Sequence, residues 1–151
     1  MLIEGKFVIK ETIQKIWDTV LQPGTLASCI PGTERMVAID DKTYETIVKQ
    51  KVGPIAVRLK FTTVLTETDP PTYVKAVGRG SDEGKMGTFT QETIVRLHEL
   101  KKGETEISYS SNVSLVGKLA TFGDRIMRAK IKSVGEEFTR NLQNKLENKT
   151  S

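Results

Sequence analysis

The chain has 151 residues, of which 37% are hydrophobic and 28% are charged, and its formal net charge is +4. This length and composition predict one globular domain with a core of its own. The single cysteine excludes an intrachain disulfide, and the mild positive charge without a long basic run argues against a nucleic-acid binding protein.

The N-terminal part of the chain predicts one strand and two short helices. Residues 2–10 alternate between apolar and polar side chains, as in a half-buried strand. Thr12 can cap a helix, and Pro23 can open a second one that stops before Pro31-Gly32. The first residues lack the apolar segment of a secretory signal, and no apolar run approaches the ~18 residues that cross a bilayer. We therefore expect a cytoplasmic protein.

Residues 34–115 alternate with a period of two almost throughout, which indicates consecutive strands. Turn signals separate them, among them Asp40-Asp41-Lys42, Gly53-Pro54 and Asp69-Pro70-Pro71. Consecutive strands of this kind pair antiparallel, and the sheet that they form twists and curls. Strands are expected over residues 36–39, 44–52, 55–66, 73–79, 89–97 and 105–115, with turns at 80–84 and 101–104.

Residues 117–146 predict one long amphipathic helix, about 42 Å in length at 1.5 Å per residue. Such a helix needs an apolar partner for its oily side, and the sheet supplies one. The fold class is therefore α+β, with a seven-stranded curved antiparallel sheet around the C-terminal helix and two short helices after the first strand. Residues 1–147 are expected to form a single domain, and 148–151 a frayed tail. The apolar stripe is Met127, Ile131, Val134, Phe138 and Leu142, widened by Leu119, Phe122 and Ile126.

The chain contains no recognisable catalytic set or metal site. His98 is its only histidine and Cys29 its only cysteine, which excludes a Cys/His zinc cluster. The two could form a nucleophile–base pair, but no third residue is evident to orient them. The glycine-rich pieces 78–80 and 84–87 lack the pattern of a phosphate-binding loop and are interpreted as strand ends or turns. We predict no catalytic residues and no metal ligands.

Several inward-facing strand positions carry polar side chains among apolar ones. In a dry core each would need a hydrogen-bond partner within the protein. In a cavity the same groups would orient a bound molecule, because ligand pockets are mostly apolar with a few polar groups. The sequence leaves both alternatives open for Thr63, Gln91, Thr93, Tyr109 and Ser111.

Five stretches occur in an order known from one family: Gly5-Lys6-Phe7, Trp17, Leu26 to Gly32, Val52 to Ile55, and Gly117 to Gly123. On these residues the chain resembles the CoxG family, named after the G subunit of carbon monoxide dehydrogenase, within the START-like or birch-allergen-like helix-grip (SRPBCC) superfamily. The resemblance covers nearly the whole chain. It implies a seven-stranded sheet that grips the C-terminal helix and encloses a hydrophobic cavity.

The resemblance also implies a function. Most superfamily members bind lipids, sterols, polyketides or other apolar molecules, and some are enzymes. CoxG-like proteins are associated with molybdenum-containing carbon monoxide dehydrogenases and related hydroxylases. Their proposed roles are enzyme maturation, membrane recruitment and delivery of electrons towards quinone. Longer relatives carry a membrane-attaching extension, so we expect this chain to contact the inner face of the membrane peripherally at most.

Our first hypothesis is non-catalytic binding of a largely apolar small molecule, lipid or quinone-like, between the sheet and the C-terminal helix. No intrinsic cofactor is expected beyond such a bound quinone or lipid. The residues expected to line the cavity come from the short helices, the sheet and the long helix. They are Trp17, Leu26, Ile30, Ile55, Val57, Leu59, Phe61, Phe89, Gln91, Tyr109, Val113, Met127, Ile131, Val134 and Phe138.

Two other hypotheses remain. The chain could be an assembly, maturation or membrane-recruitment factor for a molybdenum hydroxylase, and its contact surface would then be Arg125, Arg128, Lys130 and Lys132. Alternatively, it could be an enzyme that uses the cavity for hydrolysis or cyclisation. That reading would require activity that depends on His98 or Cys29.

Overall fold

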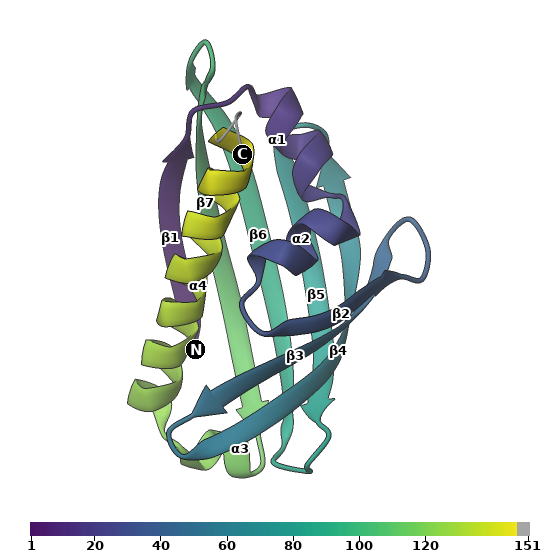
Figure 1. The fold of residues 1–151 in the computed structure, drawn as a ribbon, viewed down its shortest axis with the longest axis vertical. Coiled ribbons are helices and arrows are strands. Elements are labelled where there is room, and N and C mark those ends of the chain that lie inside the picture. Colours follow the sequence, from purple (N-terminus) through teal and green to yellow (C-terminus); the bar gives the residue numbers. More distant parts are fainter. Residues whose placement is uncertain (148–151) are drawn as a thin grey trace.

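The computed structural model describes residues 1–147 and has the expected α+β helix-grip architecture (Figure 1). Seven antiparallel strands form one curved sheet in the order β1-β7-β6-β5-β4-β3-β2, and the helices lie on one face of it. The predicted fold class is confirmed, whereas the predicted tail at 148–151 lies outside the described residues. The elements are β1 (Leu2–Ile9), α1 (Ile13–Val20), α2 (Pro23–Cys29), β2 (Thr33–Ala38), β3 (Thr43–Val52), β4 (Ile55–Asp69), β5 (Tyr73–Asp82), β6 (Thr88–Lys101), β7 (Glu104–Val116), α3 (Lys118–Thr121) and α4 (Asp124–Glu147).

The two short helices form as the sequence predicts. The hydroxyl of Thr12 caps α1 by accepting a hydrogen bond from the backbone N–H of Lys15 at 3.3 Å. Pro23 occupies the first turn of α2, where a missing backbone N–H costs nothing. Ile16 of α1 and Cys29 of α2 are each 1% exposed, so both helices are fixed by apolar packing against the rest of the domain.

The C-terminal helix differs from its prediction, because it is two helices rather than one. The chain leaves α3 at Phe122 and begins α4 only after Gly123, whose φ is +84°. A left-handed residue interrupts the helix and changes the direction of the chain, which apolar spacing alone does not reveal. Leu119 is consequently buried in α3, while Ile126 is 51% exposed and does not belong to the inward stripe.

One predicted turn is also wrong. We expected the strand from Tyr73 to end at Arg79 and a turn to follow at 80–84, but β5 continues to Asp82. The carboxylate of Asp82 explains the later turn, because it accepts hydrogen bonds from the backbone N–H groups of Arg58 at 2.8 Å and Met86 at 3.0 Å. This buried acid therefore closes the β5–β6 hairpin and attaches it to β4.

Polar side chains of α4 cover the free edge of β1. Arg128 donates a hydrogen bond to the carbonyl oxygen of Leu2 at 2.7 Å, and Gln143 donates one to that of Val8 at 3.0 Å. Unpaired strand edges invite pairing with other chains, and these contacts satisfy part of that edge. They also fix α4 along β1, on the left of Figure 1.

The apolar core is divided into two clusters at opposite ends of α4. The first cluster joins α1, α2, the ends of the long strands and the C-terminal part of α4, and the second joins α3, the β3–β4 hairpin and the N-terminal part of α4. The first contains buried Ile9, Ile16, Cys29, Leu97, Ile107, Leu142 and Leu146. The second contains buried Val52, Val57, Leu119 and Met127, with Met1, Ile55, Leu59, Met86, Leu115 and Phe122 packed against them.

Candidate ligand-binding site

The candidate site lies between the two clusters, where side chains that face between the sheet and α4 are only half-buried. We call six of them the inner band: Phe61, Phe89, Gln91 and Tyr109 from the sheet, with Ile131 and Val134 from α4. None of the six belongs to either cluster. Since each retains exposed surface, solvent reaches the space between the sheet and the helix, and the middle of the domain is less tightly filled than its ends.

The floor of this region has small residues on β5, the middle strand of the sheet. Gly80 is paired with Phe61 of β4 on one side and with Phe89 of β6 on the other. The two phenyl rings meet edge to face across the glycine, with centroids 5.3 Å apart and planes at 70°. A Cβ atom at Gly80 would overlap the Cβ of Phe61. The glycine therefore allows an aromatic pair to cover the centre of the sheet.

The polar groups of the region divide into two kinds. The hydroxyls of Thr93 and Ser111 lie 2.8 Å apart and share a hydrogen bond, so the core-network alternative holds for this pair. The carboxamide of Gln91 and the hydroxyl of Tyr109 form no hydrogen bond with another residue in the described part of the chain. A polar group of a bound molecule could therefore use both.

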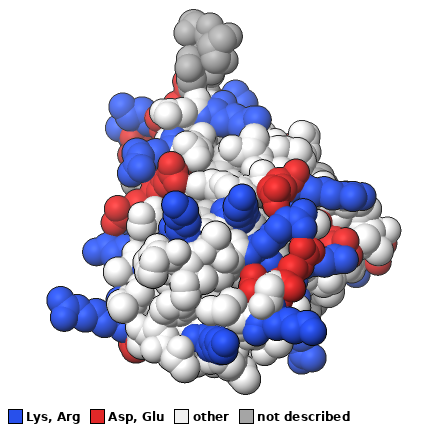
Figure 2. Space-filling view, turned by 60° about the horizontal axis from the view of Figure 1, so that its bottom comes forward, with Lys and Arg blue, Asp and Glu red and all other residues white. Residues whose placement is uncertain are grey.

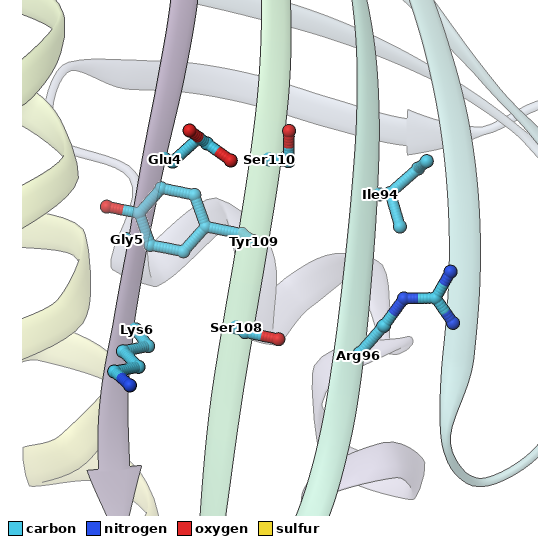
Figure 3. A pocket seen from close by; sticks show the side chains of 8 residues that line it. All are labelled: Glu4, Gly5, Lys6, Ile94, Arg96, Ser108, Tyr109 and Ser110. Carbon is cyan, nitrogen blue, oxygen red and sulfur yellow. The ribbon is translucent and has the colours of Figure 1, made fainter.

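Two glycines determine the position of Tyr109. Its ring crosses Gly5 of β1 on the way to α4 (Figure 3). A Cβ atom at Gly5 would lie 2.5 Å from the Tyr109 hydroxyl oxygen, and one at Gly135 of α4 would lie 3.9 Å from it. Phe7 flanks the ring at a centroid distance of 6.4 Å. Tyr109 therefore fills the narrow space between β1 and α4, where it forms one side of the candidate site.

We expect Gly5→Ala to lower the free energy of unfolding by about 1–3 kcal/mol and to weaken ligand binding, because the new methyl group displaces the Tyr109 ring. Chemical denaturation and ligand titration would measure the two effects. Gly24→Ala is the matched control, since a Cβ at Gly24 has no neighbour within 4 Å. The double variant G5A/Y109L should recover stability, because leucine lacks the ring atoms that clash. Full stability of Gly5→Ala alone would contradict this role of the glycine.

The structure distributes the predicted cavity residues over three environments. Four of them (Ile55, Val57, Leu59 and Met127) belong to the second cluster or pack on it, and Phe138 packs on the first. Trp17 and Val113 are buried in neither cluster. The half-exposed remainder comprises the inner band together with Leu26 and Ile30, which come from α2 and the residue that ends it. Sequence reasoning missed Gly5, Gly80 and Gly135, which create the space.

The site itself holds no charged side chain among the six residues of the inner band. Ionisable groups with shifted pKa values lie elsewhere. Hydrogen bonds from Glu34 and Glu83 raise the pKa of exposed Arg58, and a hydrogen bond with Glu67 raises that of Lys75. Burial raises the pKa of Tyr44, which donates a hydrogen bond to the Leu21 carbonyl at 3.2 Å. The site is therefore suited to an uncharged molecule.

The four cations predicted as a partner surface do not share one side of α4. Arg128 bonds the edge of β1 and also pairs with Asp124 at 3.5 Å. Two helical residues at a spacing of 100° place Lys130 about 160° around the helix from Arg128. Arg125 and Lys132 are exposed and form no ion pair with another residue of the described chain.

The structure does not bring Cys29 and His98 together. Cys29 is buried in the first cluster, where it packs with Leu97, whereas His98 is exposed on the opposite face of β6. Within residues 1–147, no group of three or more His, Cys, Asp or Glu side chains is placed to hold a metal ion. None of the helices in that range is both long enough and apolar enough to cross a membrane.

Two shallow pockets lie on the outer face of the sheet, away from α4. One, of about 410 Å³, is drawn in Figure 3 and is lined by Glu4, Lys6, Arg96 and small polar residues of β7. The other, of about 580 Å³, lies beside it, where the guanidinium of Arg96 covers the ring of Tyr73 at 4.7 Å. Their mixed charges and exposed side chains are typical of a solvated sheet face.

Comparison with known proteins agrees with this geometry. The family model for CoxG, the G subunit of carbon monoxide dehydrogenase, matches residues 5–147. A conserved protein from Geobacillus kaustophilus superposes with a TM-score of 0.90 at 20% sequence identity, over 98% of this chain and 96% of that chain.

More distant structures share the same fold. A START superfamily protein from Mycobacterium smegmatis has a TM-score of 0.76 at 11% identity over 99% of both chains. The Zhui aromatase/cyclase from Streptomyces sp. R1128 has a TM-score of 0.73 at 10% identity, over 100% of this chain and 96% of that chain. No curated protein sequence matches the chain significantly. At these identities the structural likeness shows the fold alone.

Proposed function

The chain belongs to the CoxG family of carbon monoxide dehydrogenase, and on that premise we propose that it is a non-catalytic carrier of a largely apolar small molecule, lipid or quinone-like. The molecule binds between the sheet and α4, against the inner band. The observation that carries the proposal is the half-exposed middle of the domain between two packed clusters. A protein selected only for stability would fill that space with side chains.

The chemistry of the inner band supports an apolar body with a small polar group. The Phe61 and Phe89 rings, with Ile131 and Val134 opposite, offer apolar surface. Burying a ligand against it contributes about 25 cal/mol per Å² before the cost of association is subtracted. The free groups of Gln91 and Tyr109 would bind a carbonyl or hydroxyl group, which quinones and many lipids possess.

Native mass spectrometry of freshly purified protein tests the proposal first. We expect a stoichiometric apolar compound that stays with the folded chain and is released by denaturing extraction, which would also identify it. An empty protein is then offered a quinone and a phospholipid in detergent. Failure to retain either would contradict carriage and would favour a role in assembly through protein contacts.

We also propose that the chain works beside a molybdenum-type carbon monoxide dehydrogenase or a related hydroxylase, on the cytoplasmic side of the membrane. The support is the family to which it belongs. Exposed Arg125 and Lys132 on α4 would attract an acidic surface of such an enzyme. Co-elution with a purified carbon monoxide dehydrogenase at low salt, lost at high salt and in the double variant R125E/K132E, would support the association. Separate elution at low salt would contradict it.

A further inference from the structure

The end of the molecule around α3 combines free cations with exposed apolar side chains. We call it the α3 end: it comprises the β3–β4 turn, the β5–β6 hairpin, α3 and the first turn of α4, at the bottom of Figure 1. Backbone hydrogen bonds hold these parts together, including one of 2.7 Å from Leu119 N–H to the Met86 carbonyl. It is therefore one continuous surface, built from segments far apart in the sequence.

The cations of the α3 end have no acidic partners. Lys51, Lys85, Lys118 and Arg125 are all exposed, and none forms an ion pair with another residue among 1–147. In Figure 2, which turns this end forward, Lys and Arg side chains surround a largely uncharged area. The surface is thus positively charged around an uncharged centre.

The acidic groups of the same end are already occupied. Glu83 pairs with Arg58, and Asp124 pairs with Arg128 at 3.5 Å. Asp82 is buried, and its carboxylate accepts backbone hydrogen bonds. These acids consequently do little to neutralise the exposed cations.

Apolar side chains project from the same surface. Val116, just before α3, is 64% exposed, and Ile126 in the first turn of α4 is 51% exposed. Leaving such large apolar side chains in water costs free energy, and clusters of them rimmed by polar groups mark contact surfaces.

We propose that the α3 end docks onto the surface of an anionic lipid bilayer. The cations match the negative potential of anionic headgroups, which attracts each Lys or Arg near the surface. Val116 and Ile126 are placed to enter the boundary between headgroups and acyl chains. An acidic protein would satisfy the cations but would offer the projecting apolar side chains no comparable layer.

The backbone of Lys85 supports this assignment. Its φ is +62°, a left-handed conformation that lysine adopts only at a cost and that glycine adopts freely. A cation is thus held at the tip of the β5–β6 hairpin although glycine would suit the backbone better. Strained residues of this kind are common at functional surfaces.

The docked surface also covers one end of the candidate site, a step that rests on the proposed function. α3 lies between Gly117 and Gly123, whose φ values of +87° and +84° allow sharp changes of chain direction on either side. It places Leu119 and Phe122 in the second cluster, among adaptable methionines. Outward movement of α3 would open the inner band towards the bilayer from which an apolar cargo comes.

Vesicle flotation with the full chain tests the docking surface. We expect the protein to float with phosphatidylcholine vesicles that contain phosphatidylglycerol, and to stay in solution with pure phosphatidylcholine or at high salt. The double variant V116S/K118E should bind the anionic vesicles about tenfold more weakly or less, because it removes an apolar contact and reverses a charge.

The β6–β7 hairpin at the opposite end of the molecule supplies a matched control. L100S/K102E repeats the same two changes at the same spacing, because Leu100 is 46% exposed and Lys102 is exposed as well. This control should float like the wild type. Lys85→Gly provides a second variant whose backbone is relaxed rather than strained, and it should keep its melting temperature while it binds anionic vesicles several-fold more weakly.

Equal flotation with neutral and anionic vesicles, or equal losses in V116S/K118E and L100S/K102E, would overturn the docking proposal. So would a wild-type protein that stays in solution with every vesicle. These outcomes are independent of the cargo test. A chain that carries a stoichiometric apolar compound but never floats would refute the docking surface alone, and one that floats but is never loaded would refute carriage alone.

Discussion

Phe61→Arg is expected to abolish ligand binding and leave a folded protein, with a loss in affinity of about 100-fold or more. The guanidinium would stand at the centre of the inner band, where no carboxylate is available to pair with it. An apolar ligand would have to desolvate that charge in order to bind. Because Phe61 is only half-buried, the free protein can keep the charge in water and remain folded.

Thr62→Arg is the matched control, since Thr62 is the next residue of β4 and is exposed on the opposite face of the sheet. Ligand stoichiometry by native mass spectrometry and thermal melting would be measured for both variants. Wild-type affinity in Phe61→Arg would remove the inner band from the binding site. An equal loss in Thr62→Arg would show that the effect is one of net charge.

Leu142→Ala is expected to lower the free energy of unfolding by about 2–5 kcal/mol, the range found for leucine truncation in packed cores. Leu142 is 2% exposed and belongs to the first cluster, where its neighbours come from β1, α1, α2, β6 and β7. Removing its side chain leaves a cavity that these elements cannot close together. Because the first cluster lies beyond the inner band, the folded fraction should bind ligand with unchanged affinity.

Urea denaturation measures this effect, and Ile126→Ala on the same helix is the control. Ile126 is 51% exposed, so its truncation should change stability by no more than about 0.5 kcal/mol. Equal destabilisation by the two substitutions would contradict the division of α4 into a packed end and an exposed first turn. Loss of ligand affinity in folded Leu142→Ala would contradict the separation of the first cluster from the site.

The fold was predictable from the sequence because strict alternation leaves few choices for seven strands and one apolar helix. The break between α3 and α4 was not predictable in this way. Leu119 and Phe122 have helical spacing with Met127, and only the φ of Gly123 separates the two helices. A glycine in a helical pattern is tolerated in many proteins, so the residue type alone does not reveal the break.

The candidate site was predictable only in part, because period two tells which face a residue takes but not how full that face is. Val57 and Phe61 share the inner face of β4, yet Val57 is packed in the second cluster and Phe61 is half-exposed. The signal that could have distinguished them is the run of small inward residues on β5, including Gly80. We interpreted this glycine as part of a turn, and its pairing across the sheet became evident only in the structure.

The pairing of β1 with β7 has a consequence for synthesis of the chain on the ribosome. Leu2 lies opposite Asn112, so the first strand to be translated pairs with the last. At about 5–20 residues per second, the nascent β1 waits for its partner for roughly 5–20 s. α4 follows later still, so the apolar side of the growing sheet is uncovered when it leaves the ribosome. Cellular chaperones would encounter this protein as an open sheet, and the helix that completes it is the last part to arrive.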